Sequence, residues 1–566
     1  MSAPRLRACR LALLALTCLA LLLATLAPQP AALRAAAPPP SAARSPAPAF
    51  LRGPPCPPLD APRLSNVFAG THLVLQCAPA AARLWGWAAP GCALTARLHG
   101  AAAAAAPPPT TSYDETGLFI VSLPPLPCGN APLTLTLASA SGAPPLNVSF
   151  TPGHVIFCAG QSNIVGLSLA PGYEADSSVA ASLQVEPEEK KREASAPLPL
   201  YGLAVGMLDP WAGDAPLAEL ASAPEQPWAP LATAAQAARY SALCWWAGRA
   251  LARRRGGAEA VGLVVAAWSG SWLQAWATPP SLASCSAPPF GAPWAPASPS
   301  ALHNAMVAPF AVGPLALSGI IWAQGESNAL VSQASYYACG LAAAIRDWRA
   351  LFAAPGLFVG LVELAPFGRS SGAWGGGWVG VRAAQLAVAR DAALPPPVVL
   401  VPTADCRDLP GDIHPRCKFG TGTRLGEALA AALAAAGAGG AAGAGALAAL
   451  PRSGPAYSHA ERAAGGGGVR VHFVGAARGV AWVVGAGREA CEGVEAGACG
   501  GAQVRGEDGA WEEAGVEAGG GGTLLLRGGA AAAAATATRY GRGMWPANNC
   551  VDAETGWPCH PWEAEV

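Results

Sequence analysis

Short apolar runs alternate with longer amphipathic stretches between positions 155 and 436. The apolar runs have the length of buried strands, and they lie at residues 155–157, 261–267, 319–322, 357–361 and 398–401. The stretches between and after them are compatible with helices, at residues 232–254, 333–352, 381–392 and 421–436. This alternation predicts a parallel β-sheet flanked by helices.

Shorter apolar patterns that predict β-strands lie before and after this region of the sequence. Apolar runs at residues 73–75 and 118–121 are separated by Gly and Pro turns, and alternating apolar positions return at residues 469–473 and 480–484. No period of 20 to 50 residues repeats, so a solenoid or propeller is excluded. The predicted fold class is therefore α/β, a three-layer sheet with accessory all-β units on both sides.

The chain begins with three arginines before an apolar run at residues 11–27 and small residues at 35–37. This layout is typical of a secretory signal, the alternative being an uncleaved membrane anchor. Low-complexity stretches then separate the predicted folded regions. The predicted segments are a signal peptide (1–37), a Pro/Ala-rich linker (38–64), an N-terminal β-domain (65–152), a catalytic domain (153–433), an Ala/Gly linker (434–468) and a C-terminal β-unit (469–566).

Charge and cysteine content narrow the class of protein. The number of Lys plus Arg residues equals the number of Asp plus Glu residues, at 35 each. No run of basic residues accompanies aromatic residues, so the sequence lacks the charge pattern of a nucleic-acid-binding protein. Removing the signal leaves an even set of cysteines without zinc-site spacing, so we expect disulfides and no metal. Asn147 begins a glycosylation sequon. A secreted or lumenal protein without a stable membrane partner is expected.

A serine follows the first predicted strand of the central region. Residues 155–157 lead through Gly160 and Gln161 into Ser162 and Asn163. Ligands bind at the carboxyl ends of parallel strands, so Ser162 is placed to face a pocket with its N–H near a developing oxyanion. The alternative is an ordinary turn, since these residue types favour turns.

A histidine follows the last predicted strand. His414 lies in a loop after residues 398–401, with Asp412 two residues before it. A neutral imidazole can accept the serine proton, and an adjacent carboxylate would hold its tautomer. The alternative is a polar loop that precedes the next helix.

Two further strand ends carry small or polar groups. Gly270 follows residues 261–267, and Gln324 and Glu326 follow residues 319–322. A glycine lets its backbone N–H approach substrate closely, and the Gln324 amide can donate to an oxyanion. The alternative for Glu326 is an acid at a helix start.

These segments resemble the sequence blocks of SGNH-type hydrolases, and specifically of the sialate O-acetylesterase family. The residues that match are Gly-Gln-Ser-Asn at 160–163, Gln-Gly-Glu-Ser-Asn at 324–328 and Ile-His-Pro at 413–415, followed by Lys418. The similarity extends from about residue 70 to residue 433. It implies an SGNH-like catalytic sheet, no cofactor, and acetylated carbohydrate and water as substrates.

The resemblance also implies roles for individual residues. Ser162 would form an acetyl-enzyme and His414 would shuttle the proton, while the Ser162 N–H, Gly270 and Gln324 would hold the oxyanion. Asn163 and Glu326 are assigned to the same oxyanion and substrate region.

The acid behind His414 departs from the family pattern. Relatives commonly place an acid three residues before the histidine, where this chain has Gly411. Asp412 is therefore the predicted acid, with Asp408 and Asp405 as substitutes, or with a backbone carbonyl that orients His414 instead.

Two alternative functions stay open on the sequence. The same blocks would serve an acetylesterase acting on xylan or another wall polysaccharide. A protein of a different class would bind glycans without catalysis and keep the hydrolase core as a relict.

Overall fold

The structure is a computed structural model, and the chain divides into two units at residues 1–55 and 56–566. The described residues all belong to the second unit and are 61–90, 92–100, 109–113, 116–166, 178–185, 197–207, 215–288, 298–329, 331–367, 374–406, 413–438, 442–443, 445, 454–464, 467–476, 478–483, 499–519, 522–528, 532, 534–541, 545–546, 550–555 and 557–566. The predicted signal peptide and nearly all of the first linker lie outside them. Among the described helices, none combines the length and apolar character that crossing a bilayer requires.

The central sheet is built on buried strands rich in Val, Ile and Leu. Along its main path the strand order is β10-β9-β11-β8-β12-β13-β14. All neighbours on this path are parallel except β10, which pairs antiparallel with β9 at the edge. The strands are β8 (Leu146–Gly160), β9 (Leu200–Ala204), β10 (Gln226–Pro230), β11 (Ala260–Ala267), β12 (Gly319–Ala323), β13 (Phe358–Val362) and β14 (Val398–Val401).

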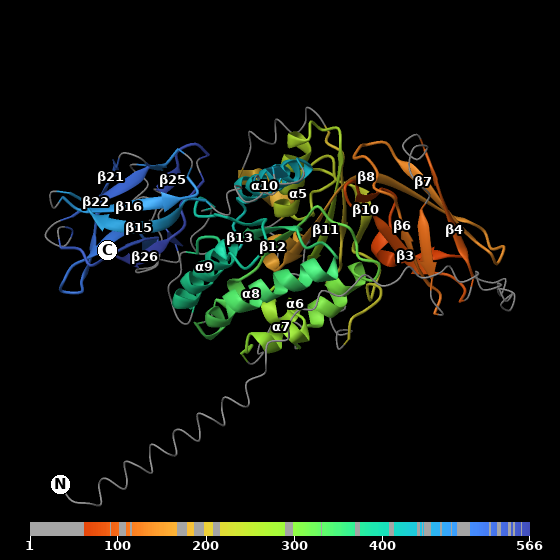
Figure 1. Ribbon diagram of the computed structural model, residues 1–566, viewed down its shortest axis with the longest axis horizontal. Coiled ribbons are helices and arrows are strands. Elements are labelled where there is room, and N and C mark those ends of the chain that lie inside the picture. The colour runs from red at the N-terminus through yellow and green to blue at the C-terminus, as the bar shows by residue number, and fades with distance from the viewer. Residues whose placement is uncertain are drawn as a thin grey trace, which may run out of the picture. The chain divides into compact units, whose positions relative to one another are not determined.

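Helices cover both faces of this sheet (Figure 1). Successive side chains of β8 alternate between two cores, because Ile156 and Cys158 pack in the cluster with α5 and α10 while Phe157 and Ala159 join the opposite cluster. The α/β three-layer architecture is thereby confirmed. The helices are α2 (Ser162–Val165), α3 (Val179–Val185), α5 (Ala242–Arg254), α6 (Leu273–Trp276), α7 (Pro279–Ser284), α8 (Val331–Leu351), α9 (Trp374–Arg390) and α10 (Lys418–Gly437), with short turns η1 (Asn66–Phe68), η4 (His303–Val307), η5 (Ala308–Phe310) and η6 (Glu326–Asn328).

The N-terminal β-unit shares a strand with the central sheet. The 15-residue strand β8 pairs with β2 and β7 along its first part and with β11 and β12 along its second. The boundary predicted between residues 152 and 153 therefore falls inside one continuous strand, whose ladder keeps both parts hydrogen-bonded. The strands of this unit are β1 (Arg63–Leu64), β2 (Leu73–Gln76), β3 (Arg83–Trp87), β4 (Leu94–His99), β5 (Thr110–Tyr113), β6 (Leu118–Ser122) and β7 (Leu133–Ser139).

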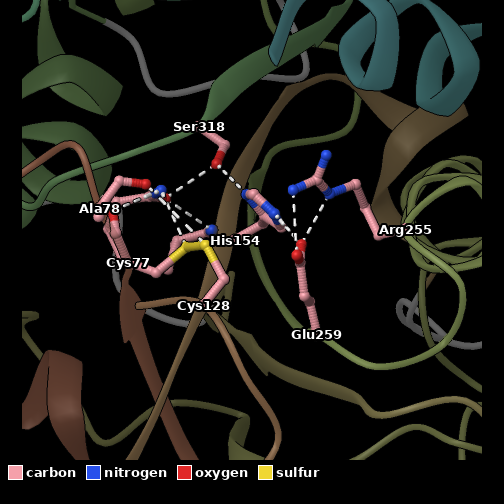
Figure 2. Close-up of polar contacts among 9 residues, drawn as sticks. Cys77, Ala78, Cys128, His154, Arg255, Glu259 and Ser318 are labelled. Carbon is pink, nitrogen blue, oxygen red and sulfur yellow. Dashed lines mark hydrogen bonds and ion pairs between the residues drawn. A yellow bond between two sulfur atoms is a disulfide. The ribbon is translucent and has the colours of Figure 1, made fainter. Parts of the chain in front are cut away.

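A polar cluster lies where this unit joins the amino ends of the central strands (Figure 2). His154 bonds Ser318 Oγ through Nδ1 at 3.0 Å and Glu259 Oε2 through Nε2 at 2.8 Å, beside the disulfide Cys77–Cys128. The sulfurs and a ring nitrogen are close enough to hold a metal. However, the two sulfurs are bonded to each other, and both ring nitrogens of His154 already have hydrogen-bond partners. We therefore assign the cluster a structural role.

Disulfides confirm the expected cysteine chemistry. Besides Cys77–Cys128, the described bonds are Cys158–Cys244, Cys285–Cys339, Cys406–Cys417 and Cys550–Cys559. Asn147 is exposed on β8, where Thr136 Oγ1 donates to its Oδ1 at 2.7 Å. Its glycosylation stays a prediction.

The second predicted linker is wrong at both ends. Helix α10 continues to Gly437, because alanine is the best helix former, and β15 occupies residues that were predicted as linker, where it pairs with β16. The strands of the C-terminal unit are β15 (Ala456–Arg462), β16 (Val469–Val474), β17 (Val480–Trp482), β18 (Cys499–Gly500), β19 (Ala502–Arg505), β20 (Trp511–Glu513), β21 (Gly515–Gly519), β22 (Thr523–Arg527), β23 (Ala537–Tyr540), β24 (Trp545–Pro546), β25 (Cys550–Asp552) and β26 (Trp562–Glu565).

Candidate active site

Ser162 lies at the turn between the end of β8 and the start of α2. Gly160 makes this turn possible, because its φ is 142° and a Cβ there would lie 2.1 Å from the carbonyl oxygen of Ala323. The chain therefore leaves the sheet sharply at its carboxyl edge. Ser162 is half-buried at this edge.

His414 is placed directly against this serine. Its Nε2 lies 2.8 Å from Ser162 Oγ, a hydrogen-bond distance, although the residues are 252 positions apart. The loop of His414 connects β14 to α10, and the disulfide Cys406–Cys417 brackets it. A hydroxyl bonded to an imidazole is the arrangement that activates a serine nucleophile.

The acid behind His414 stays a prediction. Asp412 and Asp408 lie outside the described residues. Asp405 is described, and its carboxylate is paired with Arg424, whose Nη1 donates to Asp405 Oδ1 at 2.9 Å. The carboxylate of Asp405 therefore already forms an ion pair with Arg424.

Gly270 follows β11, the strand next to β8. It adopts a φ of 69° and is half-buried at the same edge of the sheet as Ser162. The N–H of nearby Trp268 donates to the carbonyl of Gly160 at 2.9 Å, which ties the two strand ends together. The oxyanion role of Gly270 stays a prediction.

Gln324 lies at the carboxyl end of β12, inside a buried network of amides. Its Nε2 is within hydrogen-bond distance of the Ser271 carbonyl at 3.0 Å and of Asn328 Oδ1 at 2.7 Å, and Tyr337 Oη donates to its Oε1 at 2.8 Å. A primary amide has only two N–H groups. To donate to an oxyanion, Gln324 would therefore have to give up one of these bonds.

Asn163 and Glu326 are hydrogen-bonded to each other. Asn163 Nδ2 donates to Glu326 Oε1 at 2.6 Å, and Lys418 Nζ donates to Asn163 Oδ1 at 2.7 Å. Burial raises the pKa of Glu326, against smaller opposing effects from hydrogen bonds and from the Lys418 charge. Sequence reasoning assigned Lys418 no role, and its position just after the histidine block was the available signal.

A pocket opens beside these residues at the carboxyl ends of β12, β13 and β14. It encloses about 360 Å³, part of it open to solvent, and its polar lining includes Asn163, Gln324, Glu326, Glu363 and Lys418. The site thus combines a serine–histidine pair with a turn that offers backbone donors, and the partly apolar pocket adjoins them at Asn163, the residue after Ser162. These are the parts that acyl transfer requires.

Comparison with known proteins identifies the family. The sequence profile of the carbohydrate esterases described as sialic acid-specific acetylesterases matches residues 152–435, which is half of the chain. The chain belongs to this family. The matched residues run from the middle of β8 to the end region of α10, so they include Ser162 and His414.

Curated members of the family are distant in sequence. Human sialate O-acetylesterase is 26% identical over 299 residues, which cover 50% of this chain and 52% of the relative. The mouse sialate O-acetylesterase is 23% identical over 317 residues, 50% of this chain and 55% of the relative. The match thus spans about half the length of these relatives.

A solved structure supports the fold over a larger part of the chain. A carbohydrate acetylesterase from Xanthomonas citri is 26% identical with a TM-score of 0.67, and the alignment covers 89% of this chain and all of the other. The likeness therefore extends beyond the residues matched by the family profile.

Proposed function

We propose that this protein is a serine esterase that removes acetyl groups from carbohydrate hydroxyls. The hydrogen bond between Ser162 and His414 at the carboxyl edge of the sheet carries the proposal. The family profile and the acetylesterase from Xanthomonas citri support the same chemistry. In this proposal Ser162 is the nucleophile and His414 is its general base.

The reaction proceeds in two transfers. Ser162 Oγ attacks the acetyl carbonyl while His414 Nε2 takes the hydroxyl proton, and the imidazolium then gives that proton to the departing sugar oxygen. The product of this half is an acetyl-serine. Water, activated by the same imidazole, attacks the acetyl-serine, releases acetate and restores the Ser162 hydroxyl.

Backbone donors stabilise the negative charge that develops on the acetyl oxygen. We assign this role to the N–H groups of Ser162 and Gly270, which come from neighbouring strand ends. Gln324 would join them if its amide left the Ser271 carbonyl on substrate binding. Asp412 is the proposed acid that orients His414.

The acetylated sugar that serves as substrate is inferred from the activities for which the relatives are named. The curated relatives are sialate O-acetylesterases, which favours an acetylated sialic acid, and acetylxylan is the second candidate. Purified protein should release acetate from one of these substrates, and Ser162→Ala should abolish the release. Activity on a simple acetyl ester but on neither sugar would keep the chemistry and reject both substrates. Inactivity on every acetyl ester would favour a glycan-binding protein.

The proposed location is secreted or lumenal, and the disulfides support an oxidising compartment. Cleavage near residue 37 would remove the predicted signal, and N-terminal sequencing of the protein expressed in a secreting host tests this. A mobility shift after enzymatic removal of N-glycans, absent in Asn147→Gln, tests the sequon.

A further inference from the structure

Three polar side chains are buried next to the loop that carries His414. Glu326 is 5% exposed, Asn163 7% and Lys418 4%, and they come from η6, α2 and α10. At this burial polar groups are usually hydrogen-bonded within the protein, and among these side chains Glu326 Oε2 is the buried atom without a hydrogen-bond partner in the described part of the chain.

Two of these side chains bind the backbone on either side of the histidine. Asn163 Nδ2 donates to the carbonyl oxygen of Ile413 at 3.1 Å, and Lys418 Nζ donates to the carbonyl oxygen of Pro415. Ile413 and Pro415 directly precede and follow His414. The backbone of this residue is therefore fixed at both of its ends.

The same side chains are bonded to each other. Lys418 Nζ donates to Asn163 Oδ1 at 2.7 Å, and Asn163 Nδ2 donates to Glu326 Oε1 at 2.6 Å. Asn163 thus accepts through its oxygen and donates through its nitrogen to two acceptors, which matches the two N–H groups of an amide. A carboxylate or hydroxyl at position 163 could not make this set of bonds.

Lys418 and Glu326 also interact electrostatically. The Lys418 ammonium donates to two neutral oxygens, and its charge opposes the rise that burial causes in the pKa of Glu326 without outweighing it. Asn163 therefore links the other two side chains, because it is bonded to both.

We propose that Asn163, Lys418 and Glu326 form a carbonyl clamp that positions the imidazole of His414 against Ser162. The inference rests on the proposed esterase function and adds positioning residues to it. Asn163 directly follows Ser162 in the chain, so the turn that presents the nucleophile also holds the loop of its base. The clamp sets the 2.8 Å separation of Ser162 Oγ and His414 Nε2.

Lys418→Met tests the clamp, because it keeps the aliphatic stem and removes the donations to Asn163 and Pro415. A displacement of about 1 Å at a reacting group costs on the order of 100-fold in rate. We expect kcat for 4-nitrophenyl acetate to fall about 10- to 100-fold with KM unchanged, since the base acts in the transition state and contributes little to ground-state binding.

Arg349→Met is the matched control. Arg349 is also a buried cation on a helix that binds carbonyls, since its Nη2 donates to Leu357 O at 2.9 Å and its Nη1 to Pro395 O at 2.6 Å. These carbonyls precede β13 and β14, at the end of the sheet opposite to His414. We expect this variant to lose stability while kcat per folded molecule stays at the wild-type value.

Two substitutions of Glu326 test its role in the clamp. Glu326→Gln keeps an oxygen that can accept from Asn163, whereas Glu326→Leu does not. We expect Glu326→Gln to retain more of the wild-type kcat than Glu326→Leu when both are corrected for the folded fraction. Equal losses in the two variants would contradict the bond to Asn163 as the reason for the role.

Ser162→Ala separates failure of the clamp from failure of the function. If Ser162→Ala is inactive and Lys418→Met has the wild-type kcat per folded molecule, the clamp is overturned and the esterase function stands. If a smaller folded fraction accounts for the whole loss in Lys418→Met, the clamp is likewise overturned. If Ser162→Ala retains wild-type activity, both proposals are overturned.

Discussion

The buried pair of Glu363 and His560 connects the C-terminal unit to the hydrolase sheet. Glu363 follows β13 and is 3% exposed, while His560 precedes β26 and is fully buried. His560 Nδ1 lies 2.8 Å from Glu363 Oε1, and the backbone N–H of Thr403 donates to Glu363 Oε2 at 3.3 Å. Removing one partner would therefore leave the other at a buried position without this bond.

Glu363→Gln keeps the shape of the side chain and removes its charge. Breaking a buried ion pair by removing one partner typically costs about 3–5 kcal/mol, because the other partner stays buried. We expect the free energy of unfolding to fall by about 3 kcal/mol, at the lower end because glutamine retains an acceptor. The exposed pair Arg63–Glu219 is the control, and Glu219→Gln should cost under about 1 kcal/mol.

The pair also predicts a dependence on pH. Burial raises the pKa of Glu363, but the charge and hydrogen bond of His560, with smaller effects of Arg382 and the Thr403 N–H, outweigh it and hold the pKa below its ordinary value of 4.5. The stability from this lowered pKa is present above that value and is lost as the pH falls through the folded-state pKa. Below pH 4.5 the wild type should therefore lose stability more steeply than Glu363→Gln.

Urea unfolding followed by tryptophan fluorescence measures these changes, and protease cleavage reports release of the C-terminal unit. A double-mutant cycle with His560→Gln isolates the pair. We expect a coupling free energy above about 1 kcal/mol, whereas costs that add within about 0.5 kcal/mol would refute the reasoning.

The structure also predicts the effects of three further sets of substitutions. Removing the disulfide around the histidine loop with Cys406→Ala and Cys417→Ala should cost about 2–3 kcal/mol in thermal unfolding and lower kcat, and an unchanged kcat would show that the disulfide does not hold the loop. Gly160→Ala should prevent soluble expression or lower the melting temperature strongly, because the Cβ would meet a backbone carbonyl; a wild-type melting temperature would contradict this close approach. Gln76→Leu removes the oxygen that accepts from the Val155 N–H at 2.9 Å, so it should cost about 1–3 kcal/mol in urea unfolding with kcat unchanged. A changed kcat would contradict the placement of Gln76 away from the site.

Continuous apolar runs predicted the central strands well. The run at residues 398–401 coincides with β14, and helix α8 begins and ends within two residues of the predicted stretch 333–352. Strands β9 and β10 were missed because Gly, Pro and polar residues interrupt their apolar pattern. Their strand conformation depends on pairing with neighbours, which a local pattern does not contain.

The candidate site was predictable as a set of residues and less so as a set of contacts. Strand order alone indicated that Ser162 and His414 could meet, since parallel strands end at the same edge. The bonds of Gln324 and Asn163 to other buried groups were not predictable, because they depend on the rotamers and depths of residues far apart in the chain. Family blocks identify residue types, whereas hydrogen-bond partners come from packing.

Trapping the acetyl-enzyme tests the central claim most directly. The protein is mixed with an acetyl ester, quenched in acid within one turnover and digested, and the peptide containing Ser162 is examined by mass spectrometry. We predict one added acetyl group on Ser162 in the wild type and none in Ser162→Ala. Acetate release without acetylation of Ser162, or unchanged release by Ser162→Ala, would contradict the account.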